Sequence, residues 1–288
     1  MILSIITINR NNLDGLRRTS ESISIQSNQE FEWIVVDGAS TDGSAEYIKS
    51  VCRSNIITIS EPDTGIYNAM NKGTRLAHGE YCLYLNSGDV LHDDGVVDFL
   101  LKTCGTRKYD VLRGTMQCVW RDTGKKIISP SPKEITIVFL FSGFISHCAT
   151  LIRRSLLLKY PYDEHFKIVS DHHFFRQIYL FENKLQDIRM NPKVVIADFD
   201  MSGISNTQYD TCSTEGLESG KMLLGERLNH EFLDFIYGKG FFDSILCSMR
   251  RCDFWRITMY VWLLPLIVLF KSINIALHLP FIVKHLLR

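Results

Sequence analysis

Short apolar segments alternate with helix-like segments over the first 115 residues, and this alternation limits the possible folds more than any other feature of the sequence. Short apolar strands that are separated by helices are typical of a parallel sheet with right-handed crossovers. The sequence therefore predicts an α/β fold with a mostly parallel sheet flanked by helices. The expected strands lie at residues 2–8, 33–36, 56–59 and 81–85, and the expected helices at 12–27, 44–52 and 66–78.

The rest of the chain is less regular. We expect short strands within residues 110–121, at 148–152 and at 193–197, a loop at 129–134, and helices at 154–159 and 171–181. After about residue 205 the chain becomes polar and helical, and it ends in two apolar runs at 257–270 and 273–283. We therefore predict one domain over residues 1–205 and a helical, partly apolar C-terminal extension over residues 206–288.

Charge and cysteine content narrow the possible partners and compartments. The 32 basic residues balance the 32 acidic ones, so the sequence gives no global signal for nucleic-acid binding. The eight cysteines contain no CxxC pair, which indicates buried free thiols in a reducing compartment. The start of the chain has no basic n-region and too short an apolar run for a secretory signal. We therefore expect a cytoplasmic protein.

The last 40 residues are basic and apolar, which indicates an anionic membrane surface. The run at 257–270 would reach only about 21 Å as a helix, whereas a bilayer core needs about 30 Å. Joining it to 273–283 would bury Lys271 near the bilayer centre. We therefore expect helices in the interface of the inner leaflet, with packing on the catalytic domain or on a second subunit as the alternative.

Polar clusters follow the predicted strands at the edge where parallel sheets bind ligands. Asp37 in VVDGASTDGS suits a hydrogen bond from the ring N–H of uracil or guanine, or alternatively a turn. In SEPDTGIYNAMNKG, Asp63 suits a helix cap, and Lys72 suits either a diphosphate contact or a solvated surface.

Two later segments carry further carboxylates. Asp89 closes YLNSGD, where it can bind a divalent metal or end the strand as an N-cap. Asp171 precedes a helical apolar pattern and can be a general base in a cleft or a simple N-cap. His147 either lines the same cleft or is a packed core histidine.

Taken together, these segments resemble family 2 glycosyltransferases of the GT-A fold over roughly residues 2–205. SIITINR resembles the first strand of that family, VDGASTDGS its base-binding loop and LNSGD its DxD-type metal motif. EPDTGIYNAMNKG is similar to a segment of a subgroup that acts in surface-polysaccharide assembly. HCATLIRRSLL with FKIVSDHHFF resembles the acceptor-side region, and ADFDMSGIS resembles the subgroup's strand and glycine turn.

The resemblance implies a Rossmann-like GT-A catalytic domain in which Asp37 reads the nucleobase, Asp89 holds Mg²⁺ or Mn²⁺, and Asp171 is the general base. It places His147 on the acceptor side. The sequence departs from the family pattern at Asn86 and Gly88, where acids are common, and at His173, where a second acid is common. The nucleotide-sugar-binding residues that the resemblance implies are Thr7, Asn9, Asp37, Ser40, Asp63, Asn71, Lys72, Asn86 and Ser87.

The expected activity is that of an inverting hexosyltransferase. It would move a sugar from a UDP- or GDP-sugar to a lipid-linked glycan acceptor during O-antigen, capsule or exopolysaccharide synthesis, at the cytoplasmic face of the inner membrane. A non-catalytic sugar-nucleotide-binding or scaffold protein is the alternative, because the metal motif is reduced. A dinucleotide-dependent oxidoreductase is disfavoured, because INRNN rather than G-x-G-x-x-G follows the first strand.

Overall fold

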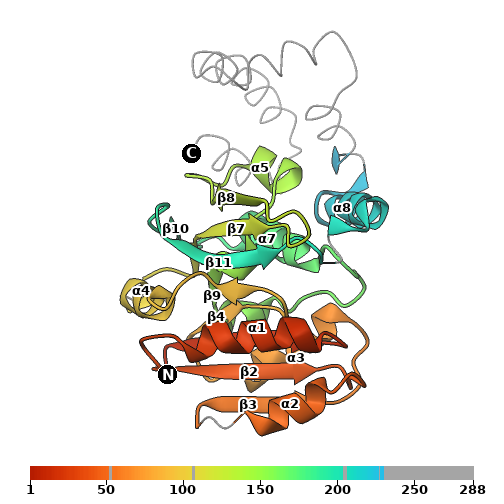
Figure 1. The fold of residues 1–288 in the computed structure, drawn as a ribbon. Coiled ribbons are helices and arrows are strands. Elements are labelled where there is room, and N and C mark those ends of the chain that lie inside the picture. The colour runs from red at the N-terminus through yellow and green to blue at the C-terminus, as the bar shows by residue number, and fades with distance from the viewer. Residues whose placement is uncertain (52–53, 106–107, 204–205, 227, 230–288) are drawn as a thin grey trace, which may run out of the picture. The chain divides into compact units, whose positions relative to one another are not determined.

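The computed structural model describes residues 1–51, 54–105, 108–203, 206–226 and 228–229 (Figure 1). Its contacts divide the chain into two compact units. One comprises Met1–Glu134 with Ile145–Gly216, and the other comprises Ile135–Phe144 with Leu217–Arg288. The division into domains 1–205 and 206–288 that the sequence suggests stays a prediction.

The main sheet runs in the order β10-β6-β9-β4-β1-β2-β3 within the described residues. β1 pairs in parallel with both β2 and β4, and β2 pairs in parallel with β3. β9 lies antiparallel between β4 and β6. The strands are β1 Leu3–Asn9, β2 Phe31–Asp37, β3 Ile56–Ser60, β4 Tyr81–Tyr84, β6 Val111–Arg113, β9 Thr150–Arg153 and β10 Asp187–Arg189.

A smaller sheet has the order β5-β11-β7-β8 within the described residues. β11 is parallel to β7, whereas β5 and β8 are antiparallel to their neighbours. Its strands are β5 Val90–Leu91, β7 Thr115–Val119, β8 Lys126–Pro130 and β11 Val195–Asp200. β8 reaches into the expected loop at 129–134, because its last residues pair with the start of β7 in an antiparallel hairpin.

The expected helices are present with shifted ends, and α4 and α5 were not expected. The helices are α1 Leu13–Ser24, α2 Ser44–Ser50, α3 Ile66–Leu76, α4 Val96–Cys104, α5 Ile137–Ser142, the 3₁₀ helix η1 His147–Ala149, α6 Arg154–Lys159, α7 Ser170–Phe181 and α8 Tyr209–Leu224.

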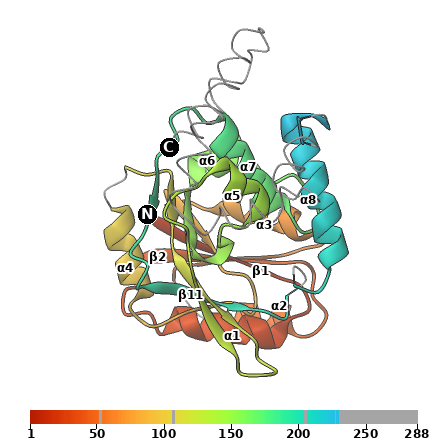
Figure 2. The ribbon, with the colours of Figure 1, turned by 90° about the horizontal axis from the view of Figure 1, so that it is seen from above.

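Helices cover both faces of the parallel strands, as the apolar character of those strands requires. On one face, Leu3 and Ile5 belong to the same buried cluster as Leu16 of α1. On the other face, a Cβ on Gly73 of α3 would lie 2.5 Å from Cγ2 of Ile6, so the glycine lets α3 approach the sheet closely. Figure 2 shows α1 and α3 on opposite sides of the strands. The predicted α/β fold with a helix-flanked sheet is confirmed.

None of the helices that the structure describes is both long and apolar enough to cross a bilayer. The apolar runs at 257–270 and 273–283, which carry the membrane-interface prediction, lie outside the described residues.

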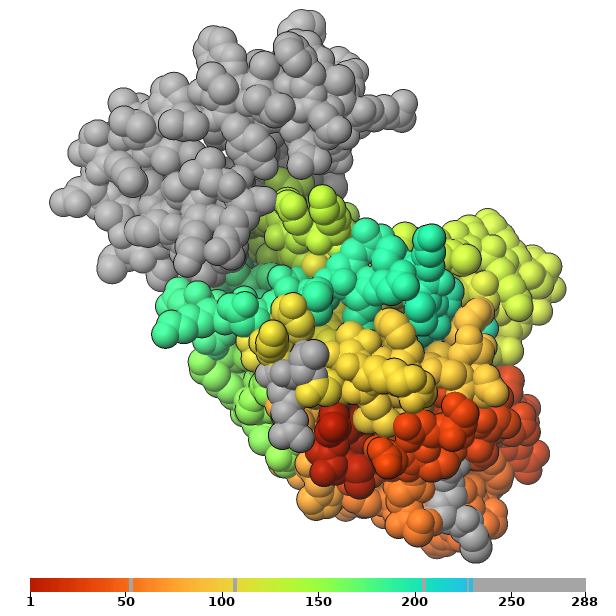
Figure 3. Space-filling model, turned by 90° about the vertical axis from the view of Figure 1, so that its left-hand side faces the viewer, coloured from red at the N-terminus to blue at the C-terminus, as the bar shows by residue number. Residues whose placement is uncertain are grey.

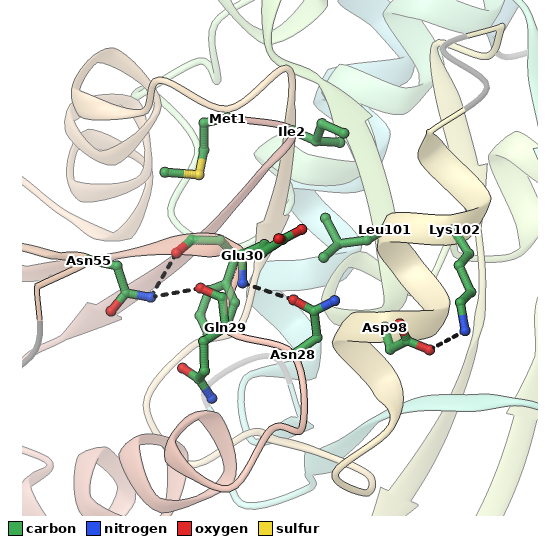
Figure 4. Close-up of a pocket in the computed structure, with 10 residues that line it drawn as sticks. Met1, Ile2, Asn28, Gln29, Glu30, Asn55, Asp98, Leu101 and Lys102 are labelled. Atoms are coloured by element: carbon green, nitrogen blue, oxygen red, sulfur yellow. Dashed lines mark hydrogen bonds and ion pairs between the residues drawn. The ribbon is translucent and has the colours of Figure 1, made fainter.

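A cavity of about 520 Å³ lies at the amino ends of β1 and β2, opposite the edge where the sequence places the site (Figure 4). On this face the start of the chain lies beside α4 (Figure 3). The cavity combines an Asp98–Lys102 ion pair with polar and apolar walls, and none of the predicted site residues lines it. Its lining residues are Met1, Ile2, Asn28, Gln29, Glu30, Phe31, Asn55, Asp98, Leu101 and Lys102.

Hydrogen bonds of the Glu32 carboxylate join β2 to β1 and to the turn before β4. This carboxylate accepts hydrogen bonds from the Ser4 hydroxyl, from the backbone N–H groups of His78 and Gly79, and lies 3.0 Å from Nδ1 of His78. Burial opposes ionisation, but these hydrogen bonds outweigh it and lower the pKa of Glu32. A lowered carboxyl pKa contributes stability above the ordinary value of 4.5, and that stability is lost as pH falls through the folded-state value.

We therefore expect Glu32→Gln to lower the free energy of unfolding by about 1–3 kcal/mol near neutral pH, because the charge-assisted hydrogen bonds weaken. The difference from the wild-type protein should shrink as pH falls well below 4.5. Urea unfolding at several pH values measures this difference, with the exposed Glu30→Gln as the matched control. An equal difference at all pH values would show that the Glu32 charge is not responsible.

Candidate active site

The Asp37 carboxylate lies at the end of β2 and is completely buried. Oδ1 accepts hydrogen bonds from Nδ2 of Asn9 at 2.8 Å and from Oγ of Ser40 at 2.5 Å. Oδ2 accepts from the Ser40 N–H at 3.0 Å and from Oγ of Ser60 at 2.7 Å. Burial alone would raise the pKa of Asp37, but these four donors lower it. The carboxylate is therefore ionised, and a hydrogen bond from a nucleobase would have to replace one of these four donors.

Asn9 joins the loops that follow β1, β2 and β4. Its Nδ2 also lies 3.2 Å from Oγ of Ser40, and its Oδ1 accepts a hydrogen bond from Oγ of Ser87 at 2.7 Å. The structure thus brings Asn9, Asp37, Ser40 and Ser87 together, as the sequence predicts for neighbouring strand ends. Thr7 lies deeper, fully buried, between the carbonyl of Leu85 and the indole of Trp33.

Two non-glycine residues beside this network have left-handed backbones: Asn11, with φ +49°, and Ala39, with φ +56°. Hydrogen bonds hold this conformation, since the Asn11 N–H donates to Oγ of Ser40 and Oδ1 of Asn11 accepts from the Thr41 N–H. Such strain persists only where the surroundings fix it, and it is common at ligand sites.

Asp89 is buried at the end of the β4 loop and faces Asp200 of β11. The Asp200 N–H donates to Oδ1 of Asp89 at 2.9 Å. Burial, with a smaller contribution from the Asp200 charge, raises the pKa of Asp89 to about 7. Two arginine side chains form ion pairs with Oδ2 of Asp200: Nε of Arg121 lies at 2.6 Å and Nη2 of Arg18 at 3.3 Å.

Asp63 and Lys72 order the loop between β3 and α3. Asp63 pairs with Arg10 at 3.5 Å and accepts a hydrogen bond from the Gly65 N–H. A Cβ on Gly38 would lie 2.2 Å from Oδ2 of Asp63, so a larger residue there would displace the Asp63 carboxylate. Nζ of Lys72 binds Glu61 at 2.7 Å and the carbonyl of Pro62 at 2.9 Å. In this structure the Lys72 ammonium therefore binds the loop that precedes its own helix, and its diphosphate contact stays a prediction.

Asn71 lies away from the strand-end loops and faces the Tyr162–Glu164 segment that precedes α7. Its Nδ2 donates to the carbonyl of Tyr162 and to Glu164, and its Oδ1 accepts from the Tyr162 N–H. Asn68 also donates to Glu164, at 2.8 Å. The hydrogen bond from Asn71 is the largest influence and lowers the pKa of Glu164, although burial acts in the opposite direction. Helix α3 thus carries a polar face that fixes the chain before α7.

Asp171 is the second residue of α7 and not its N-cap, which is Val169. Its Oδ1 lies 3.0 Å from the hydroxyl of Tyr67 and accepts the N–H of His172. The carboxylate of Glu215 fixes the preceding turn by accepting three backbone N–H groups, those of Lys167, Ile168 and Val169. The side chain of Asp171 is only partly buried, so it remains accessible to a proton donor.

His147 packs within an aromatic cluster beside Asp171. Its ring stacks on Tyr84 with centroids 4.7 Å apart, and Nε2 lies 2.8 Å from the hydroxyl of Tyr162. Burial is the largest influence and lowers the pKa of His147, although the Asp171 charge acts in the opposite direction. Since Tyr84 ends β4, this cluster connects the Asp171 region to the strand that leads to Asp89.

Comparison with known proteins places this arrangement in a family. Residues 4–160, more than half of the chain, match the family model described as "Glycosyl transferase family 2". The chain belongs to this family. An uncharacterized glycosyltransferase of Mycobacterium tuberculosis is 26% identical over 267 residues, which cover 86% of this chain and 98% of the relative. A PGL/p-HBAD biosynthesis glycosyltransferase of Mycobacterium bovis is 29% identical and covers 66% of this chain and 73% of its own length.

Solved structures show the same GT-A fold. S. aureus TarS 1–349, in complex with UDP-GlcNAc, superposes with a TM-score of 0.64 at 19% identity, covering 78% of this chain and 66% of that one. The mannosyltransferase PcManGT from Pyrobaculum calidifontis, in complex with GDP-Man and Mn²⁺, gives 0.57 at 15% identity, covering 78% and 64%. The resemblance to the family that the sequence motifs indicate is confirmed.

The residues around Asp89 fit a hard divalent cation, because they offer oxygen ligands. Oδ1 of Asn86 is buried and has no hydrogen-bond partner in the structure, which is costly unless a ligand binds it. Asp200 adds a second carboxylate, although Ser202 donates to its Oδ1 and two arginines contact its Oδ2. Within the described part of this family 2 glycosyltransferase, however, no three His, Cys, Asp or Glu side chains are grouped to hold an ion. Phosphate oxygens or water would have to complete the coordination.

Sequence reasoning missed four charged residues of the site: Arg18, Arg121, Asp200 and Glu215. Asp200 had a usable signal, since it follows an apolar strand in the same way as Asp37 does. Arg121 and Glu215 had none, because their partners lie tens of residues away in the chain.

We expect a divalent cation with a nucleoside diphosphate to raise the Tm of the wild-type protein by a few degrees, since ligands that bind the folded state stabilise it. Asp89→Asn should abolish the cation-dependent part of this rise. Differential scanning calorimetry with and without Mn²⁺ measures it, with Asp98→Asn on α4 as the matched control. An unchanged cation effect in Asp89→Asn would place the ion elsewhere.

Proposed function

We propose that this family 2 glycosyltransferase transfers a hexose from a nucleoside diphosphate sugar to an acceptor hydroxyl with inversion of the anomeric centre. The observation that carries the proposal is the link between its two principal carboxylates. Asp171 is held by Tyr67, whose ring packs against Tyr162, and Tyr162 in turn packs against Tyr84 of β4, whose loop carries Asp89. A base and a candidate metal ligand therefore belong to one continuous set of contacts.

The donor site that we propose is the edge formed by the loops after β1, β2 and β4. Asn9, Ser40 and Ser87 supply hydrogen-bonding groups there, and Arg18 and Arg121 supply positive charge. Solved neighbours of the same fold bind UDP-GlcNAc and GDP-Man, which supports a nucleotide-sugar donor. Asp37 can contact the nucleobase in this site only if one of the protein groups that donate hydrogen bonds to Asp37 moves away.

The proposed reaction is a single displacement. The acceptor oxygen attacks the anomeric carbon from the side opposite the diphosphate while the proton of that hydroxyl passes to Asp171. The carbon–oxygen bond to the diphosphate breaks, and the nucleoside diphosphate leaves with the bonding electron pair. Mg²⁺ or Mn²⁺ held by Asp89, with Asn86 and Asp200 nearby, would neutralise charge on the leaving group when it is bound.

For the biological setting, we propose surface-polysaccharide assembly on a lipid-linked acceptor at the inner face of the plasma membrane. The support is the subgroup motif EPDTGIYNAMNKG, the basic apolar C-terminal sequence and a relative named for PGL/p-HBAD biosynthesis. Co-sedimentation of the full-length protein with anionic but not with neutral vesicles would support this location, and recovery in the supernatant with both would contradict it.

A non-catalytic sugar-nucleotide-binding protein is the second candidate. The observation that favours it is the reduced metal motif, in which Asn86 and Gly88 replace acids that are common in the family. This candidate predicts donor binding with no transfer and no donor hydrolysis, so a donor screen with a lipid-linked acceptor extract separates the two.

We expect Asp171→Asn to retain the fold and donor binding but to slow transfer by roughly 10²–10⁴-fold, the usual contribution of a general base. Transfer rates at saturating donor, together with donor affinity, measure this effect. Asp210→Asn is the matched control, because Asp210 also lies in the first turn of a helix, α8. Near wild-type transfer by Asp171→Asn would refute the assignment of the base.

A further inference from the structure

Tyr67 of α3 places a buried hydroxyl directly against the proposed base. Its side chain is almost completely buried, and the hydroxyl oxygen lies 3.0 Å from Oδ1 of Asp171. The same oxygen is within hydrogen-bonding distance of the carbonyl of Ile168. One hydroxyl proton thus has two acceptors, a carboxylate and a peptide carbonyl. Burial, followed by the negative charge of Asp171, raises the pKa of Tyr67 well above its ordinary value, so the hydroxyl keeps its proton.

Both acceptors are fixed relative to α3. Glu215 holds the N–H groups of residues 167–169, and therefore the turn that presents the Ile168 carbonyl. Asn71 and Asn68 bind the Tyr162–Glu164 segment to the same helix that carries Tyr67. The hydroxyl, the carbonyl and the carboxylate therefore form a preorganised triangle. The mechanism described above does not use this triangle.

We propose that Tyr67 is a positioning residue for Asp171 that shifts its hydrogen bond as the base takes up a proton. Before transfer, the Tyr67 hydroxyl donates to the Asp171 carboxylate and orients it. After transfer, the new Asp171 O–H donates to the Tyr67 oxygen, and the Tyr67 hydroxyl donates to the Ile168 carbonyl. A single proton moves from the acceptor hydroxyl to Asp171, and Tyr67 keeps its own. This inference rests on the proposed role of Asp171.

Other groups also influence Asp171 electrostatically, and they stay unchanged when only the Tyr67 hydroxyl is altered. Beyond Tyr67, the described titratable groups that interact with its charge include His147 of η1, Tyr162, the adjacent His172 and Cys212 of α8. A change at Tyr67 that keeps the ring therefore isolates the contribution of the hydroxyl.

The test is the pH profile of kcat/KM for Tyr67→Phe in the full-length protein. Loss of the donor makes ionisation of the base harder, so the ascending limb should move to higher pH by about half a unit to one unit. We expect kcat to fall by about tenfold and KM for the donor sugar to stay within about twofold, since the hydroxyl acts on proton transfer. Tyr81→Phe is the matched control, because it removes a hydroxyl that contacts the Tyr109 carbonyl and Arg153 at the start of β4.

A second variant carries 3-fluorotyrosine at position 67, which keeps the hydroxyl but makes it a stronger donor. Its ascending limb should move to lower pH, and this variant decides the outcome if Tyr67→Phe fails to fold. An unshifted limb in a folded Tyr67→Phe, or in the fluorotyrosine protein, overturns the inference. If the limb is unshifted but Asp171→Asn is inactive, only the role of Tyr67 is wrong. If Asp171→Asn remains fully active, the assignment of Asp171 as the base is wrong.

Discussion

A buried carboxylate that is fully supplied with hydrogen-bond donors holds the carboxyl edge of the main sheet together. An ionised carboxylate in an apolar interior is costly unless donors replace the water that it loses. Asp37 meets this demand with donors from Asn9, Ser40 and Ser60, which belong to three adjacent strand ends. Ser40, one of these donors, also accepts the N–H of Asn11, whose backbone is left-handed. The strand-end loops are therefore ordered before any ligand arrives, which lowers the entropy cost of binding.

Helix α3 connects this edge of the sheet to the segment that contains Asp171. One of its faces packs on β1 and β2 through Gly73, and the face with Tyr67 and Asn71 holds the chain that leads to Asp171. This arrangement explains the motif EPDTGIYNAMNKG in physical terms. Its last glycine, Gly73, allows the close packing, and Tyr67 and Asn71 position the proposed base. Placing a catalytic group to within a fraction of an ångström needs such a rigid support.

The sequence predicted the order of strands and helices in the first 85 residues and the polar clusters at the strand ends, because periodicity and turn chemistry are local. It did not predict α4 or β8, the latter of which depends on pairing with β7. Side-chain partners were harder still. Asn71 and Lys72 are adjacent on one helix, yet Asn71 binds Tyr162 and Lys72 binds Glu61. Only the tertiary fold decides this, as it does for Arg121 and Asp200.

The most direct test of the donor site is amide hydrogen exchange with and without a nucleotide sugar. UDP-GlcNAc and GDP-mannose, each with Mn²⁺, are the probes, because solved neighbours bind these donors. Assignment of the donor to the carboxyl edge predicts added protection in the loops at 9–12, 38–43 and 85–89. It also predicts no change at residues 28–30, which line the cavity at the opposite edge of the sheet. Protection confined to that opposite cavity, or absent from all three loops with every donor tested, would contradict it.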